Sequence, residues 1–412
     1  MKNRTSKGFA STCIHGNLHP DLNQSHLTPI YASSTYTFSD SAQAVERFTN
    51  EQPGYIYGRF GHPTGTEVEE KIAAMEAYGL LDDRQESLKL KAILHGSGMG
   101  AVSTLFLANL KQGEKLLTHL SLYGGTQEFI DKVLPSCGIE TILMDFSDPQ
   151  AIAHTLQSDS GIRMVYLETP ANPTLQCVDI ERITTLAHQY GCLVAVDNTF
   201  ATPYLQQPFR WGVDFVLHST TKFLNGHGTA IGGILLGRNI EWMQTKATKH
   251  FRLLGAAVSA FDAFLLNNGL KTLPLRMQQH GRNAEQVAGF LEAHPAVERV
   301  NYLGLKSHPH FALAQKQMKH PGALLSFEIK GGMQAAMYCM DALQLCTRAV
   351  SLGTVDTLVS HPATTTHVGV DPILRRQSGI TDGLIRMSVG IEDIEDILND
   401  LQFALEASQR MR

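Results

Sequence analysis

A lysine and a carboxylate each follow a run of apolar residues, in positions where they could act together. Lys222 comes directly after residues 215–221, a segment that passes from apolar to hydroxyl side chains. Asp197 ends the earlier apolar run 193–196. A desolvated lysine amine can form a Schiff base with an aldehyde. A carboxylate at a neighbouring strand end could hold a protonated pyridine nitrogen, and the two groups together are what pyridoxal phosphate (PLP) requires.

Each of these residues alone has an ordinary explanation. A lysine after a strand commonly begins a solvated helix, and Asp197 could cap the next turn through Asn198 and Thr199. The hydroxyls of residues 219–221 could form an N-cap cluster. Their order along one chain is what favours a cofactor site.

A glycine-rich turn could hold the cofactor's phosphate. Residues 96–101, Gly-Ser-Gly-Met-Gly-Ala, follow an expected strand and open a helix. Glycines there let backbone amides approach an anion, and a helix N-terminus favours negative charge. The hydroxyls of Ser219 and Thr221 could donate to the same phosphate. The spacing matches neither the Walker A motif nor the dinucleotide fingerprint, so a tight strand-to-helix turn is the alternative.

Three further segments carry candidate side chains. Tyr57 and Arg59 precede the first long helix and could form a charge-assisted pair with a phosphate, although a loop arginine is commonly solvated. Tyr123 follows another strand and could stack on a pyridine ring, or could simply be a core tyrosine. Arg386 lies in the apolar run 385–390, where its planar fork suits a substrate carboxylate; a structural salt bridge is the alternative.

Short apolar runs alternate with helical segments from about residue 64. The expected strands are 92–94, 115–118, 141–146, 164–168, 193–197, 215–218 and 233–237. Continuous Val, Ile and Leu runs separated by helices predict an α/β fold with a parallel sheet buried on both faces. Ligands of such sheets bind beyond the carboxyl ends of the strands, where Glu168, Asp197 and Ser219 are expected.

The pattern divides the chain into three parts. Residues 1–63 lack sustained helical periodicity and predict an N-terminal arm that contacts a neighbouring subunit. Residues 64–262, which begin with an amphipathic helix at 67–75, predict the PLP-binding domain. Residues 263–412 predict a smaller α+β domain, with a helical stretch at 263–276, apolar runs at 322–329 and 344–350, and a last helix at 391–407.

Composition excludes several function classes. The chain has 412 residues, 43% of them hydrophobic, and a formal net charge of −5, so no basic surface suggests nucleic acid or anionic lipid. Six scattered cysteines without C-x-x-C spacing predict no metal site and a reducing compartment, the cytoplasm. No signal peptide and no apolar run long enough to span a bilayer is present in the sequence.

Taken together, these motifs resemble the PLP-dependent cystathionine and methionine metabolism (trans-sulfuration) family, with methionine γ-lyase and cystathionine γ-lyase as the nearest members. The resemblance covers residues 8–407. Its most specific segments are Val-Asp-Asn-Thr at 196–199, Ser-Thr-Thr-Lys at 219–222, Glu-Thr-Pro-Ala-Asn-Pro at 168–173 and Leu-Ile-Arg-Met-Ser-Val-Gly at 384–390. It implies the aspartate-aminotransferase-like fold (PLP fold type I).

The resemblance also implies a role for each cofactor-binding residue. Lys222 would bind the cofactor covalently and then transfer protons, while Asp197 would bind the pyridinium nitrogen. Tyr123 would stack on the ring and assist departure of the γ-substituent. The phosphate would be held by Gly98, Met99, Ser219 and Thr221, and by Tyr57 and Arg59 of a neighbouring subunit.

The remaining implied roles concern the substrate and the assembly. Arg386 would bind the substrate carboxylate, Asn172 would approach the ring oxygen, and Ser351 would steady the lysine. Val350 and Tyr57 would also line the substrate site. The least active unit would be a dimer, and the family is usually a tetramer built as a dimer of dimers.

Several positions depart from the patterns of individual family members. Gly125 stands where methionine γ-lyases typically carry cysteine, and Val350 stands where cystathionine enzymes often carry glutamate. The segment 251–256 looks shorter than in methionine γ-lyases. His62 replaces a usual asparagine, and Thr229 replaces a usual aspartate. These differences bear on the substrate and leave the cofactor prediction intact.

The sequence therefore predicts a PLP-dependent carbon–sulfur lyase. It would act by α,γ-elimination on methionine, homocysteine or cystathionine and release a thiol, ammonia and a 2-oxo acid. The first alternative is γ-replacement, as in cystathionine γ-synthase or an O-acylhomoserine sulfhydrylase. An aminotransferase, or a binding protein that kept the fold and lost the chemistry, are further alternatives.

Overall fold

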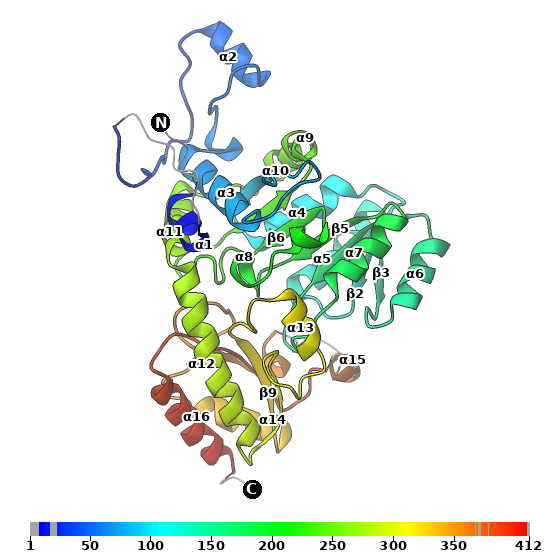
Figure 1. Ribbon diagram of the computed structural model, residues 1–412, viewed down its shortest axis with the longest axis vertical. Helices are drawn as coiled ribbons and strands as arrows, with labels where there is room; N and C mark the ends of the chain where they lie inside the picture. The colour runs from blue at the N-terminus through cyan, green and yellow to red at the C-terminus, as the bar shows by residue number, and fades with distance from the viewer. Residues whose placement is uncertain (1–7, 17–22, 367, 370–371, 378, 410–412) are drawn as a thin grey trace.

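The computed structural model describes residues 8–16, 23–366, 368–369, 372–377 and 379–409. The expectation that the chain has no signal peptide concerns residues 1–7, which lie outside the described residues. Within it the chain forms a larger and a smaller domain, joined by one long helix, with the N-terminal segment projecting from the larger one (Figure 1).

The larger domain is built on a sheet of seven strands in the order β1-β7-β6-β5-β4-β2-β3. They are β1 (Lys91–His95), β2 (Lys115–His119), β3 (Glu140–Met144), β4 (Ile162–Glu168), β5 (Leu193–Asp197), β6 (Phe215–His218) and β7 (Gly233–Gly237). Each coincides with a predicted strand to within a few residues. The central strands β2 to β6 are parallel, whereas β7 runs antiparallel to both β1 and β6. The sheet is therefore mostly parallel, which confirms the sheet expected of PLP fold type I.

Alternating side chains of the strands supply two separate cores. Val194, Val196 and Val216 pack into one cluster with α3 (Pro63–Glu76) and α7 (Ile180–Gln189). Ala195 and Leu217 pack into the other, with α4 (Gly98–Asn109) and α5 (Gly124–Lys132). Because both faces are covered, the strands consist of nearly continuous apolar residues.

Further helices complete the larger domain. They are α6 (Pro149–Ser158), α8 (Thr202–Leu205), α9 (Ile240–Trp242), α10 (Thr248–Leu254) and α11 (Ala260–Lys271). The single helical stretch predicted at 263–276 is in fact two helices, because α11 ends at Lys271 and α12 (Leu273–Ala293) begins two residues later. Pro274 lies in the first turn of α12, where its missing N–H costs no hydrogen bond.

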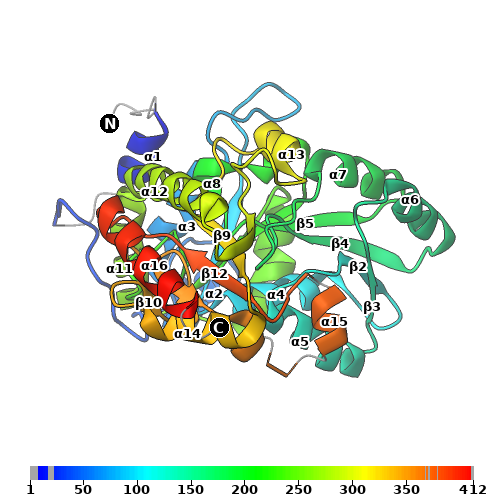
Figure 2. The ribbon, with the colours of Figure 1, turned by 90° about the horizontal axis from the view of Figure 1, so that it is seen from below.

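The smaller domain has a five-stranded sheet in the order β10-β11-β12-β9-β8. The strands are β8 (Val297–Asn301), β9 (Leu324–Ile329), β10 (Thr347–Arg348), β11 (Leu358–Ser360) and β12 (Leu384–Ser388). The helices are α13 (Phe311–Gln317), α14 (Gly332–Ala342), α15 (Pro372–Gln377) and α16 (Ile394–Gln409). A separate core fills the space between this sheet and α12, α14 and α16 (Figure 2). Of the predicted run 344–350, two residues form a strand.

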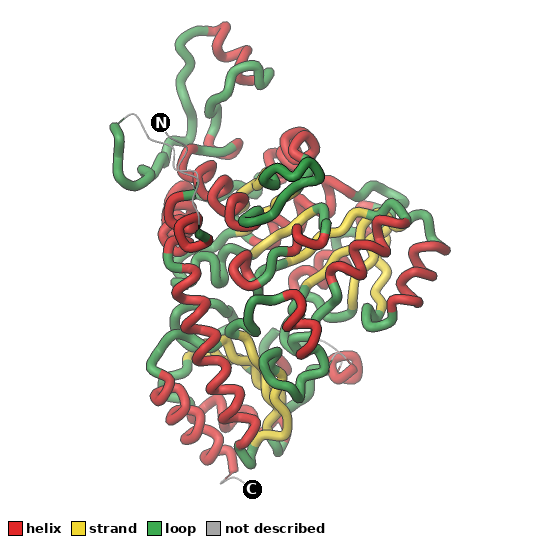
Figure 3. The backbone as a smooth tube through the Cα atoms, viewed as in Figure 1, coloured by secondary structure: helices red, strands yellow, loops and turns green. Residues whose placement is uncertain are grey.

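The N-terminal segment, which lacks sustained helical periodicity in the sequence, nevertheless contains two short α-helices among its described residues. Helix α1 (Phe9–His15) packs on α3 and α11 of the same chain, and its Cys13 is fully buried. Helix α2 (Ser41–Phe48) stands away from the body and has no buried residue (Figure 3). Both helices are about two turns long, which is too short for a clear period to show in the sequence. The arm proposed to contact a neighbour therefore corresponds best to residues 23–62.

One departure from the family pattern has a local explanation. His62 is the N-cap of α3, and its Nδ1 accepts a hydrogen bond from the Gly65 amide at 3.0 Å. Asparagine caps helices through a side-chain acceptor in the same way. His62 can therefore replace asparagine without loss of the cap. Among the described residues, no helix is long and apolar enough to cross a membrane.

Candidate active site

The parallel strands bring three predicted positions to one edge of the larger sheet. Glu168 is the last residue of β4 and Asp197 the last of β5, and the two are paired in register. Asp197 is in turn paired with Leu217 of β6, two residues before Ser219. This is the carboxyl edge at which parallel sheets bind ligands.

Lys222 is held by the smaller domain. Its Nζ donates to Ser351 Oγ at 3.1 Å, and the side chain is half-buried rather than solvated. Burial lowers the pKa of the Lys222 amine, and the positive charge of Arg386 lowers it further. The loop that carries Ser351 packs closely on the backbone next to Lys222. This close packing requires glycine at position 353, because a Cβ there would lie 2.6 Å from the backbone nitrogen of Phe223. Both effects make the Lys222 amine easier to deprotonate than a solvated lysine.

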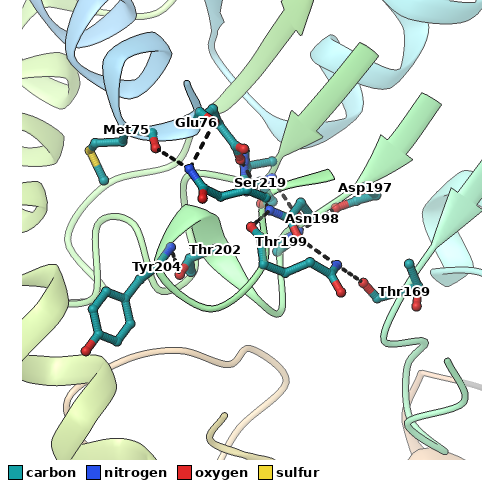
Figure 4. A network of polar contacts seen from close by, with 12 residues as sticks. Met75, Glu76, Thr169, Asp197, Asn198, Thr199, Thr202, Tyr204 and Ser219 are labelled. Carbon is teal, nitrogen blue, oxygen red and sulfur yellow. Dashed lines mark hydrogen bonds and ion pairs between the residues drawn. The ribbon is translucent and has the colours of Figure 1, made fainter. Parts of the chain in front are cut away.

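Asp197 has two differently occupied oxygens. Oδ1 accepts from the Thr199 amide at 2.9 Å, so the capping explanation considered for Asp197 is correct for that oxygen. The Thr199 hydroxyl accepts from the Ser219 amide at 2.8 Å and so fixes the next strand end relative to Asp197 (Figure 4). Burial raises the pKa of Asp197. Among the described residues no cation lies within ion-pair distance of this carboxylate.

Behind this edge, a polar network fixes the loop that follows β5. The Gln206 amide donates to Thr169 O at 2.9 Å and to Asn198 Oδ1 at 3.0 Å. Asn198 donates to Glu76 at 3.2 Å and to the Gln206 carbonyl at 2.9 Å (Figure 4). All these side chains are buried, so the network holds the ends of β4 and β5 at fixed positions.

The candidate phosphate cradle forms where α4 meets the turn after β6. Ser97 caps α4 by accepting from the Gly100 amide at 3.0 Å, and Gly98 begins the helix. A Cβ at Gly98 would lie 2.9 Å from Ser219 Cβ, so only glycine permits this approach. The Thr221 hydroxyl accepts from the Gly232 amide at 3.0 Å and lies 3.2 Å from the Gly232 carbonyl. The free amides of the α4 N-terminus and the Ser219 hydroxyl therefore face one region, as an anion requires.

Arg386 is buried without a carboxylate partner among the described residues, so the salt-bridge explanation does not hold there. It lies on β12, and its guanidinium donates to Ser351 O at 2.7 Å and to Asn172 Oδ1 at 3.3 Å. Its Nε is buried with no hydrogen-bond partner. Burial lowers the pKa of Arg386 to about 10. A buried guanidinium with unused donors is suited to a carboxylate ligand.

Tyr123 is not a core tyrosine, because 51% of it is exposed. Its backbone amide donates to Glu168 Oε2 at 2.7 Å. A Cβ at Gly125 would lie 2.7 Å from the Tyr123 ring and 3.2 Å from Met99 Sδ. The ring of Tyr123 and the side chain of Met99 therefore both lie close to Gly125, next to the start of α4.

Two predicted cofactor ligands lie apart from this group. Arg59 donates to the Arg252 carbonyl, and its guanidinium packs on the Phe60 ring, 4.8 Å from the centroid. Tyr57 is 43% exposed. Within the described part of the chain no contact joins either residue to Lys222 or Asp197. Val350 is 59% exposed beside Ser351 and could meet a substrate or a second subunit.

The residues present fit PLP. An aldehyde requires an amine, and Lys222 is half-buried with no carboxylate partner in the described chain. A protonated ring nitrogen requires an anion, and Asp197 lacks a cation. A phosphate requires amide and hydroxyl donors close together, and the Gly98–Ser219 approach provides them. No group of three or more potential metal ligands occurs among the described residues.

Sequence reasoning named Thr199 only as a capping partner of Asp197, and it did not identify Tyr166. Thr199 connects Asp197 to Ser219, and its position two residues after a strand-end carboxylate was the available signal. Tyr166 lies between Glu168 and Asp197 on the same face of the sheet. Its alternation with Glu168 along β4 could have placed both on one face, but no pattern shows which face binds the ligand.

Known proteins share both the sequence and the fold. A family model described as Cys/Met metabolism PLP-dependent enzyme matches residues 10–406. The chain is 42% identical to L-methionine gamma-lyase of Porphyromonas gingivalis over 97% of both chains. It is likewise 42% identical to L-methionine gamma-lyase of Fusobacterium nucleatum subsp. nucleatum, over 97% of this chain and 98% of that one. Cystathionine gamma synthase from Xanthomonas oryzae pv. oryzae superposes with a TM-score of 0.91 at 34% identity, covering 99% of this chain and 100% of that one.

Proposed function

Because the chain belongs to the family of PLP-dependent enzymes of Cys/Met metabolism, we propose that it is a carbon–sulfur lyase acting by α,γ-elimination. Its substrate would be methionine, homocysteine or cystathionine, and its products a thiol, ammonia and a 2-oxo acid. The observation that carries the proposal is the hydrogen bond between Lys222 and Ser351, next to the buried Arg386, which has no carboxylate partner among the described residues. Relatives named L-methionine gamma-lyase support elimination as the reaction.

Arg386 binds the substrate carboxylate and so orients the amino acid. The donors are its Nε and its Nη1, which here donates to Asn172. Burial strengthens the attraction between the guanidinium and the substrate carboxylate. When bound, PLP supplies an electron sink for the electron pair left at Cα. Asp197 keeps that sink effective by holding a proton on the ring nitrogen. Asn172, which accepts a hydrogen bond from Arg386, would contact the ring oxygen.

Lys222 transfers the protons. Its lowered pKa makes the free amine more accessible as the base that takes a proton from Cα, and the hydrogen bond to Ser351 Oγ orients Nζ. Tyr123 would stack on the ring and give a proton to the departing sulfur, because its side chain is exposed and lies close to the start of α4. Gly98, Met99, Ser219 and Thr221 hold the phosphate.

We also propose that a second copy of the chain completes the site. Tyr57 and Arg59 have no contact with Lys222 of their own chain in the described structure, and α2 projects from the body (Figure 1). An arm of this kind can place the partner subunit's Tyr57 and Arg59 on the phosphate. We therefore propose a homo-oligomer, and the family resemblance supports a dimer of dimers. Six free cysteines favour a reducing compartment, and we infer the cytoplasm.

The second candidate is γ-replacement on an O-acylhomoserine. It is favoured by the similarity to a cystathionine gamma synthase. The two reactions share every step until either water or an incoming thiol completes the cycle. Assays of the purified protein with methionine, homocysteine, cystathionine and O-acetylhomoserine, each with and without sulfide, separate them. We expect 2-oxo acid release without sulfide; turnover that depends wholly on sulfide would favour replacement.

A further inference from the structure

Glu168 connects two residues of the proposed cofactor site, Tyr123 directly and Asp197 through Tyr166. It is the last residue of β4 and only 6% exposed. Oε2 accepts from the Tyr123 amide at 2.7 Å. Oε1 lies 3.3 Å from the hydroxyl of Tyr166, which also lies 3.5 Å from Asp197 Oδ2. One carboxyl group is thus in reach of both Tyr123 and the Asp197 side chain.

The Tyr166 hydroxyl has one proton to donate and two acidic neighbours. It can donate to Glu168 or to Asp197, but not to both. Tyr166 is fully buried and pairs with Ala195, two residues before the Glu168–Asp197 pair, and its hydroxyl reaches both carboxyls. If Glu168 carries a proton of its own, it can donate to the tyrosine oxygen, and the tyrosine can then donate to Asp197. In that arrangement every proton has one acceptor and Asp197 remains the anion.

The surroundings of Glu168 favour this neutral form. Burial and the nearby Asp197 charge raise the pKa of Glu168 to about 8. The other titratable groups facing it are Tyr166, whose pKa is raised well above its usual value, and His119. His119 accepts from the Glu168 backbone amide at 2.9 Å, and burial lowers its pKa to about 4, so it brings no positive charge. No cation within ion-pair distance offsets a Glu168 charge in the described chain.

We propose that Glu168 is a positioning residue that couples the two sides of the cofactor site. Its neutral carboxyl anchors the Tyr123 backbone through one oxygen and, through the Tyr166 hydroxyl, directs a hydrogen bond onto Asp197 with the other. Neither Glu168 nor Tyr166 touches the substrate; both act through Tyr123 and Asp197. The inference rests on the proposed function, because it presumes PLP between those two residues.

The test compares four variants of the PLP-loaded enzyme with wild type. Glu168→Ala removes the hydrogen bond that anchors the Tyr123 backbone. We expect the dissociation constant for PLP, measured by equilibrium dialysis, to increase about tenfold, because a buried hydrogen bond and the ring contact are lost. Tyr166→Phe removes the donor to Asp197, so the pKa of Asp197 rises. The visible absorption of the bound cofactor changes at a certain pH on the acid side, here called the acid limb. We expect the acid limb to move to higher pH by about one unit, which corresponds to a tenfold change in proton affinity. Met164→Leu, a fully buried change on the same face of β4, is the control and should alter neither quantity.

Glu168→Gln distinguishes the neutral from the ionised carboxyl. Glutamine can accept from the Tyr123 amide and donate to Tyr166, as the neutral acid does. We expect it to stay within about threefold of wild-type affinity, with the acid limb in place. An acid limb that moves to lower pH would instead show that Glu168 is an anion competing for the tyrosine proton, and would overturn the neutral bridge.

Two other results would overturn the coupling itself. One is a Glu168→Ala enzyme that binds PLP as tightly as Met164→Leu, and the other is a Tyr166→Phe enzyme with an unchanged acid limb. If Glu168→Ala does not fold, Glu168→Gln and Tyr166→Phe still decide the question. A wild-type chain that binds no PLP covalently, shown by borohydride reduction and peptide mapping, would contradict the proposed function. Failure of the coupling alone would look different, because the wild-type enzyme would bind PLP and the variants would behave like it.

Discussion

Lys222 Nζ donates to Ser351 Oγ at 3.1 Å, across the boundary between the two domains. The larger domain provides the amine, and the loop after β10 of the smaller domain provides the hydroxyl. Ser351 also gives its carbonyl to Arg386, so one residue orients both the amine and the guanidinium. The separation between the proposed proton-transfer group and the proposed carboxylate group is therefore set by Ser351.

Replacing Lys222 with alanine should abolish covalent PLP binding. We expect turnover to fall by about a thousandfold or more, because both the attachment and the proton transfer are lost. Borohydride reduction followed by mass spectrometry measures the attachment directly. The exposed Lys246, changed to alanine, is the control and should retain the label at residue 222. A labelled Lys222→Ala protein would show that another lysine binds the cofactor.

Replacing Gly98 with alanine should weaken phosphate binding. The added Cβ would lie 2.9 Å from Ser219 Cβ, so the start of α4 must move away from the turn after β6. We expect the dissociation constant for PLP to increase at least tenfold. Gly289→Ala, inside α12, is the matched control, because its Cβ meets nothing within 4 Å. That change should raise the free energy of unfolding by about 0.5–1 kcal/mol without affecting PLP binding.

Replacing Gly125 with alanine should displace the Tyr123 ring. The new Cβ would come within 2.7 Å of that ring, and the exposed side chain has room to rotate. Turnover should drop about tenfold with a smaller change in KM, because proton donation to the leaving group needs the ring in place. At Gly124 a Cβ would meet only a carbonyl at 3.8 Å, so Gly124→Ala should be nearly silent. Equal losses in both variants would contradict this view of Gly125.

The stability of the PLP-free protein should depend on the Glu168 carboxyl. Its pKa is raised from 4.5 to about 8, so between these values the folded chain binds more protons than the unfolded chain. The free energy of unfolding should therefore decrease as pH rises from about 4.5 to about 8. Glu168→Gln should show a shallower decrease over this window in urea titrations. A decrease as steep as in the wild type would mean that other groups cause the pH dependence.

Much of the fold follows from local patterns in the sequence. The seven apolar runs became the seven strands of the larger sheet because strands buried on both faces need such runs. Asp197 and Lys222 could be predicted because each follows such a run and each carries a chemically distinct group. The helices α1 and α2 could not, because each is too short for helical periodicity to show.

Residue types and strand ends, then, were fixed by the sequence alone, because apolar periodicity depends on neighbouring residues. The pairing of Lys222 with Ser351, of Asn172 with Arg386, and of Tyr123 with Glu168 was decided by the tertiary structure. These partners lie between 45 and 214 positions apart, and no local pattern encodes which strand ends become neighbours. Sheet order and domain packing determine that, since they depend on the whole buried core.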